Sequence, residues 1–278
     1  LNNCHLVNST VEGGHWTGGL IGIAGGYSGN DGPVFMNLTI TGCSVTGSTI
    51  TGKGSAGGVI AHGTNDPWTN LSIESTTVSG NSVISTGSST NKAGAIMGTI
   101  GAAGQPTTVN GVTHTGGMSV SATVAENDVK SNGTEITTIY GRQGTPTGML
   151  ELAGGSYDKY PIEENVAYAA PVEGYEIVEN TDGTYGVEKS AVAKIGDVEY
   201  KYLQAAFDAA GTAETTINVI ANTTENITIQ EGANITLEFD EDITLNGYFA
   251  PFRGNLTING GTINNTNSGA SAIEINAG

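Results

Sequence analysis

Basic residues, aromatic residues and cysteines are all scarce in this chain of 278 residues. Nine lysines and arginines stand against 27 aspartates and glutamates, a net charge of -18 that would repel nucleic-acid phosphates. Two cysteines without a C-x-x-C pair indicate neither a zinc site nor a disulfide framework. No window approaches the ~20 apolar residues of a membrane span. We therefore expect no nucleic-acid partner, no membrane insertion and no bound metal or cofactor.

Glycine is abundant, with 43 residues, and Thr, Ser and Asn are frequent while Leu and Lys are few. This composition disfavours helices and indicates short strands joined by tight turns. Acidic residues are concentrated in the second half: residues 1–150 hold 7 Asp and Glu, and residues 151–278 hold 20. The shift in charge predicts a domain boundary near residue 150.

One short apolar box recurs three times, as Gly18-Gly19-Leu20-Ile21-Gly22, Gly57-Gly58-Val59-Ile60-Ala61 and Gly94-Ala95-Ile96-Met97-Gly98. A second box keeps the same period and begins at Cys4, Cys43 and Thr76. Two boxes in phase predict a repeat protein. Because the strands are short and their apolar residues are two apart, we expect an all-β fold, a right-handed parallel β-helix whose strands stack coil on coil. An alternative of two small coils per period stays open.

Stacking would place Cys4 and Cys43 at equivalent positions of neighbouring coils. We favour two buried thiols over a disulfide, because side chains in such a ladder point inward rather than at each other.

Asparagine also recurs before apolar-Thr-apolar strands. We interpret these asparagines as corner residues, which tolerate positive φ, rather than as glycan acceptors. They are Asn37, Asn70, Asn226 and Asn255.

Residues 151–190 interrupt the repeat and carry a hairpin signal, with Asp182-Gly183 as the turn. We predict that this segment caps the first solenoid and links it to a second one over residues 191–278. The second solenoid would begin with a capping helix, because Leu203, Ala206, Phe207 and Ala210 share one helical face before Gly211. The expected domains are thus 1–150, 151–190 and 191–278, and the last is expected to be truncated.

The Gly19-Leu20-Ile21-Gly22 box, with the preceding Asn3-Cys4 and Gly42-Cys43 boxes, resembles the GLUG repeat. The linker and helix segments look like those of large multi-repeat surface proteins of gut Gram-positive bacteria. This resemblance implies a pectate-lyase-like β-helix, a fold shared by enzymes and adhesins. It also implies an extracellular location on the bacterial surface. We expect the signal peptide, the anchor and further repeats to lie outside this fragment.

The few aromatic residues supply the candidate binding site. Tyr27 and Trp68 follow matching boxes and are expected to project from one corner of adjacent coils, together with Asp66. His15, Trp16 and His62 lie near the same boxes. Exposed rings of this kind stack on sugars or protein side chains. The structural alternative is that Tyr27 and Trp68 anchor long loops to the flank of the solenoid.

Two other groups of acidic residues could form a functional site, but we prefer a structural interpretation for each. Asp31 and Asp66 fall in equivalent loops and could form a catalytic pair, but beside Gly and Pro they are typical turn formers. Asp240-Glu241-Asp242 could bind Ca²⁺, yet it lacks calcium-loop spacing and is expected to be a solvated turn.

We therefore expect a non-enzymatic fragment of a bacterial cell-surface adhesin that binds a host protein, such as mucin or immunoglobulin, or a host glycan. A polysaccharide-active β-helix enzyme or its inactive relative is one alternative. A structural stalk without a ligand is the other.

Overall fold

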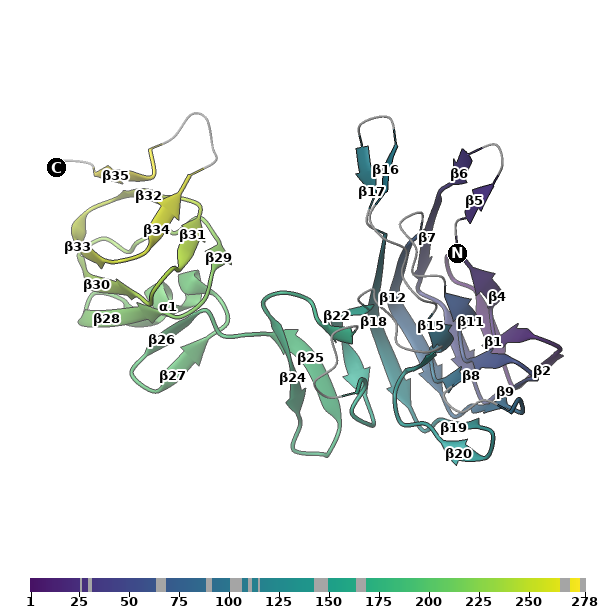
Figure 1. The fold of residues 1–278 in the computed structure, drawn as a ribbon. Helices are drawn as coiled ribbons and strands as arrows, with labels where there is room; N and C mark the ends of the chain where they lie inside the picture. The colour runs from purple at the N-terminus through teal and green to yellow at the C-terminus, as the bar shows by residue number, and fades with distance from the viewer. Residues whose placement is uncertain are drawn as a thin grey trace. The chain divides into compact units, whose positions relative to one another are not determined.

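The computed structural model describes residues 1–25, 27–29, 32–63, 69–88, 92–100, 107–109, 112–114, 116–142, 150–163, 169–265 and 271–275. This part of the chain is mostly strand, with one helix, as the all-β expectation requires (Figure 1). Its contacts divide the chain into two compact units, Leu1–Glu188 and Lys189–Gly278. No helix among the described residues is long and apolar enough to cross a membrane.

The largest sheet of the first unit joins strands from successive repeats, and most of its pairs are parallel. In-register apolar residues form ladders across it, such as Ile40, Ile73, Val120 and Leu152, and all four are buried. Cross-strand contacts between such residues stabilise a sheet. The strands are β1 (His5–Val7), β7 (Met36–Thr41), β8 (Ser44–Thr46), β12 (Thr69–Ser79), β18 (Gly117–Ala125), β22 (Leu150–Tyr157), β23 (Ala169–Pro171), β24 (Tyr175–Glu179) and β25 (Tyr185–Lys189).

Three smaller sheets complete the repeats of the first unit. One contains β2 (Thr10–Gly13), β9 (Thr49–Gly52), β13 (Ser82–Ser85), β19 (Asp128–Ser131) and the antiparallel β20 (Thr134–Glu135). The second contains β3 (Trp16–Gly18), β10 (Ser55–Gly57) and β14 (Ala93–Gly94). The third contains β4 (Ile21–Ala24), β11 (Ile60–Gly63), β15 (Met97–Ile100) and β21 (Tyr140–Arg142). Two antiparallel hairpins, β5 (Tyr27–Gly29) with β6 (Gly32–Val34) and β16 (Thr107–Val109) with β17 (Val112–His114), lie outside these sheets.

The repeated boxes are register partners. Gly57 pairs with Gly18 on one side and with Gly94 on the other, which confirms the repeat that the sequence predicts. Glycine is needed because a Cβ at Gly18 would collide with the carbonyl oxygen of Ile21, where the chain turns from β3 into β4. The equivalent collision at Gly57 is with the carbonyl oxygen of Ile60.

The two cysteines also stack as predicted. The Cys4 N–H donates to Cys43 Sγ at 3.3 Å, and both thiols are free.

The segment after residue 150 packs with the first unit. Leu150 of β22 pairs with Met118 of β18, so the parallel ladder continues through β22. β25 then pairs antiparallel with β22, and β24 lies at the edge of the sheet. The expected turn is present, with Gly183 at φ +81°. By contacts the unit extends to Glu188, beyond the boundary near 150 that the change in charge indicates.

The second unit has its own core and its own parallel pairs. Its main sheet contains β26 (Ala193–Ile195), β27 (Val198–Tyr200), β28 (Glu214–Val219), β30 (Ala233–Phe239) and β33 (Gly254–Asn259). Two smaller sheets contain β29 (Thr223–Thr224), β31 (Thr244–Asn246) and β34 (Thr262–Asn264), and β32 (Phe249–Phe252) with β35 (Ile273–Ile275).

The helix α1 (Leu203–Ala210) confirms the sequence prediction. It buries Leu203, Ala206, Phe207 and Ala210 and ends at Gly211, whose φ is +58°. The N-cap residue, Tyr202, lies just before the helix and makes no side-chain cap. Instead the Glu225 carboxylate accepts the N–H groups of Leu203 and Gln204 at 2.9 and 3.1 Å. The carboxylate thus satisfies two of the backbone donors that a helix start leaves open.

Candidate functional site

Four connections of the first unit lie at one corner, which we call the loop corner. They join β4 to β7, β11 to β12, β15 to β18 and β21 to β22. β4, β11, β15 and β21 are neighbours in one sheet, and β7, β12, β18 and β22 follow one another across a second sheet. Because neighbouring parallel strands end at the same edge, the strand ends that lead into these connections lie next to one another. Figure 1 shows the hairpins β5–β6 and β16–β17 extending from this corner.

An aromatic and histidine cluster, formed by His15, Trp16 and His62, lies beside the loop corner. The Trp16 ring stacks on His62 with centroids 5.5 Å apart and an angle of 24° between planes. The His15 ring meets Trp16 edge-on at 4.5 Å. The structure therefore brings together three of the six residues that the sequence singles out. Trp16 remains 43% exposed, so its ring is accessible to a ligand.

Local sequence explains why these rings meet. In β3 the side chain of Thr17 points inward, so that of Trp16 points outward. β11 approaches β3 closely, because a Cβ at Gly18 would lie only 2.8 Å from the backbone nitrogen of Ala61. The glycine box thereby places His62, one residue after Ala61, against Trp16.

The environment of His62 favours its neutral form. Burial lowers its pKa most strongly, and the positive charges of Lys92 and His15 lower it further. Its Nδ1 atom is buried and has no hydrogen-bond partner in the described part of the protein. A neutral imidazole stacked on an indole presents a flat platform to sugar rings or to aromatic and aliphatic side chains.

Of the other three sequence-predicted residues, the structure describes one, Tyr27. Tyr27 begins strand β5, in the connection from β4 to β7. Asp66 and Trp68 fall in the connection from β11 to β12, and they lie outside the described residues, as does Asp31. Their side-chain positions therefore remain predictions.

The corner interpretation of the recurring asparagines is wrong for three of the four. Asn37, Asn70 and Asn255 lie inside β7, β12 and β33, and none has a positive φ. Asn226 also lacks a positive φ. Asn37 and Asn70 are register partners whose side chains are hydrogen-bonded on the exposed face of the sheet. The 33-residue spacing between Asn37 and Asn70 is the signal in the sequence that could have indicated this pairing, because it matches the length of one repeat.

Metal-ligating residues do not gather in the described part of the chain, where no three His, Cys, Asp or Glu side chains could hold an ion together. Asp240, Glu241 and Asp242 form an exposed turn after β30, in which Asp242 has a φ of +61°. This agrees with the solvated turn expected from the sequence.

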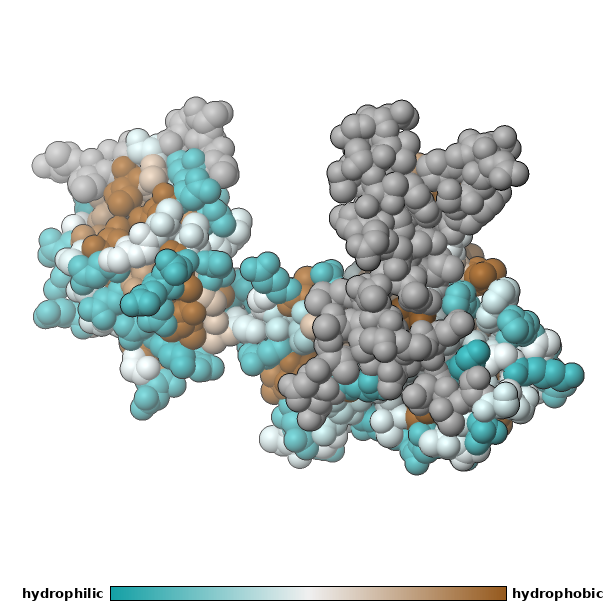
Figure 2. Space-filling view, in the orientation of Figure 1, coloured by the Kyte–Doolittle hydropathy of each residue, from teal (hydrophilic) through white to brown (hydrophobic). Residues whose placement is uncertain are grey.

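Figure 2 shows hydrophilic residues predominating on the visible described surface, with hydrophobic residues in separate clusters.

Comparison of the chain with protein-family models, with curated proteins and with solved structures finds no match.

Proposed function

We propose that both units are parallel β-helices, right-handed and in tandem, and that the first is a binding module of a bacterial cell-surface adhesin. Parallel register between residues one repeat apart, as in Gly18, Gly57 and Gly94, supports this arrangement. The GLUG-like boxes support the bacterial, extracellular assignment. The ligand would be a host glycan or a host protein such as mucin or immunoglobulin.

The observation that carries the proposal is that the strand ends flanking four connections lie side by side at the loop corner. A regular scaffold whose variable segments gather at one place is the usual design of a recognition surface, because rigid strands position loops that differ from repeat to repeat. The exposed Trp16 ring adds an aromatic anchor of the type enriched in binding hot spots.

Binding of the purified chain to arrayed host glycans, mucins and immunoglobulins tests this proposal. Three proteins are compared: the unchanged chain, the Tyr27→Ala/Trp68→Ala variant and the Trp16→Ala variant. We expect a specific ligand whose binding falls in at least one variant. Tyr202→Ala is the matched control, since Tyr202 is 55% exposed in the second unit. Absence of any ligand would favour the stalk, and turnover of a polysaccharide that is abolished by Asp31→Asn or Asp66→Asn would favour the enzyme.

A further inference from the structure

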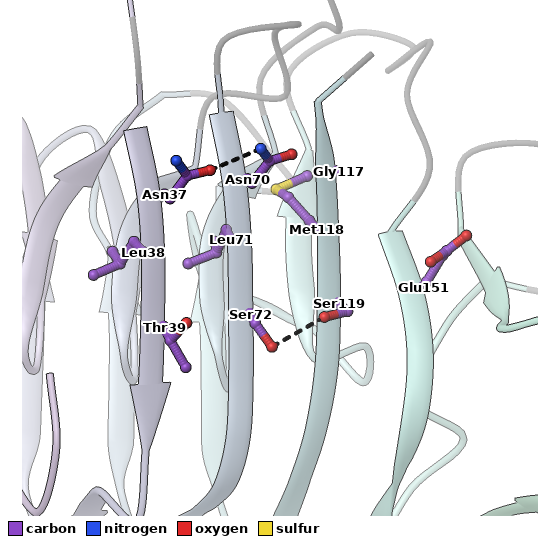
Figure 3. A pocket seen from close by; sticks show the side chains of 10 residues that line it. All are labelled: Asn37, Leu38, Thr39, Asn70, Leu71, Ser72, Gly117, Met118, Ser119 and Glu151. Atoms are coloured by element: carbon purple, nitrogen blue, oxygen red, sulfur yellow. Dashed lines mark hydrogen bonds between the residues drawn. The ribbon is translucent and has the colours of Figure 1, made fainter. Parts of the chain in front are cut away.

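A groove of about 370 Å³ crosses the strands next to the loop corner, where β7, β12 and β18 begin (Figure 3). It lies on the outer face of the sheet formed by β7, β12, β18 and β22. Its polar lining comes from Asn37, Thr39, Asn70, Ser72, Ser119 and Glu151. Leu38, Leu71 and Met118 also border it, but Leu71 and Met118 are only 3% and 2% exposed, so the accessible lining is mainly polar.

The groove contains an interrupted asparagine ladder. Asn37, Asn70 and Gly117 occupy one row in register across three strands. Asn70 Nδ2 donates to Asn37 Oδ1 at 2.8 Å, which continues the row in one direction. In the other direction the side-chain oxygen of Asn70 points toward Gly117 (Figure 3). A Cβ at Gly117 would meet no atom of the described residues within 4 Å, so among them space is open where a third asparagine would stand.

A second row, two residues further along the strands, offers further acceptors. Ser119 Oγ donates to Ser72 Oγ at 3.2 Å, and Ser72 Oγ donates to a carboxylate oxygen of Glu74 at 2.6 Å. Both hydroxyl hydrogens are therefore used within the row, and Ser119 retains acceptor capacity. Glu151, the register partner of Ser119, is exposed and offers only acceptors when ionised.

The groove thus offers acceptors on Asn70, Ser119 and Glu151 beside the amide donors of Asn37 and Asn70, and suits a ligand whose groups both donate and accept. We propose that it binds an uncharged carbohydrate chain, whose hydroxyl groups donate to Asn70, Ser119 and Glu151. Parallel strands are spaced by roughly 4.8 Å, a length comparable with one pyranose residue, so successive sugars can meet successive strands. Acidic sugars are disfavoured, because Glu151 is the one charged residue among those described as lining the groove.

A peptide fits this surface less well than a sugar chain. β12 and β18 are each hydrogen-bonded to strands on both sides, so an added peptide strand has no open backbone edge between them. A sugar chain needs no backbone edge, because its hydroxyl groups can pair with the outward side chains of Asn70, Ser119 and Glu151.

The inference rests on the proposed binding function and can be tested separately from it. Gly117→Asn fills the open position and gives the side-chain oxygen of Asn70 a donor, while the space around it predicts normal folding. Gly196→Asn is the matched control, because it makes the same substitution in open space, in the second unit, at a φ of +57° that asparagine tolerates. Glu151→Gln tests the second row.

The probes are linear hexasaccharides of glucose, mannose, galactose and N-acetylglucosamine, with hexagalacturonate and hexalysine alongside, measured by calorimetry on the full chain. We expect a neutral hexasaccharide to bind, with affinity weakened about tenfold or more by Gly117→Asn and by Glu151→Gln, and unchanged by Gly196→Asn. Preference for hexagalacturonate or hexalysine, neutral binding unaffected by Gly117→Asn, or no binding of any probe would each overturn the inference. If the chain still binds mucin or immunoglobulin in those cases, the adhesin proposal stands without this groove.

Discussion

Asn81 and Asn127 stack side by side in the interior of the first unit. Asn81 Nδ2 donates to Asn127 Oδ1 at 2.9 Å and to the Val45 carbonyl oxygen at 2.8 Å. Asn81 Oδ1 in turn accepts the N–H of Ser48 at 2.9 Å. The two amides thereby tie three successive repeats together at a turn, where backbone groups would otherwise be buried without partners.

Asn81→Ala should therefore destabilise the first unit by about 2–4 kcal/mol, since it leaves several buried polar groups without partners. Both tryptophans of the chain, Trp16 and Trp68, lie in this unit, so urea unfolding followed by tryptophan fluorescence reports on it alone. Asn37→Ala is the control, because Asn37 is exposed, and its effect should stay within about 0.5 kcal/mol. Equal losses from the two variants would contradict a structural role for the buried stack.

The glycine box makes a second prediction about stability. Gly57→Ala should cost more than about 3 kcal/mol, or prevent folding, because the added Cβ collides with the Ile60 carbonyl oxygen and with the Gly98 backbone nitrogen. Gly117→Ala is the same change at an open position and should be neutral or slightly stabilising. Thermal melting of both variants checks this contrast, and a tolerated Gly57→Ala would argue against the tight turn between β10 and β11.

The helix cap in the second unit predicts a third effect. Glu225→Ala removes the acceptor for two helix N–H groups and for the Thr223 hydroxyl, and should cost about 1–2 kcal/mol. Glu225→Gln keeps one acceptor oxygen and should cost less. Circular dichroism at the helix band, followed through urea unfolding, separates the variants. Glu231→Ala, at an exposed position, is the control and should have little effect.

Acid should destabilise the first unit through His62. Its pKa is lowered in the folded protein, so the unfolded chain takes up a proton first as the pH falls below the ordinary value of 6.5. The contribution of neutral His62 to stability is complete above that pH and is lost progressively between the unfolded and the folded pKa. Melting temperatures between pH 7.5 and 5.5 should fall less steeply in His62→Gln than in the unchanged chain. The exposed His5→Gln variant should keep the full slope, and a slope unaffected by His62→Gln would exclude this histidine as the cause.

Much of this architecture follows from residue spacing. The period of the glycine boxes predicts which strands pair, and the apolar face around Phe207 predicts the helix. The boundary at Glu188 does not follow from charge, because β22 joins the sheet through Leu150 and Leu152, whatever the acidity of the segment that follows. Charge reflects solvent exposure, whereas the boundary reflects which apolar residues share a core.

The candidate site was less accessible from sequence. Three of the proposed residues, His15, Trp16 and His62, come together because the glycine box brings β3 and β11 close. The groove could not be found in the same way, because its lining depends on register between strands more than 30 residues apart. The sequence marks Asn70 as a recurring asparagine, but only the structure places Gly117 beside it, where a third asparagine would continue the row.

Hydrogen–deuterium exchange of the full chain, with and without the best glycan or mucin ligand from the binding screen, tests the central claim most directly. If the loop corner and the groove below it form the binding surface, added protection should appear in peptides covering residues 12–41, 60–74 and 112–121 of the first unit. Little change should appear in residues 189–278. Protection confined to the second unit, or spread over the sheet of β2, β9, β13 and β19, would contradict the account.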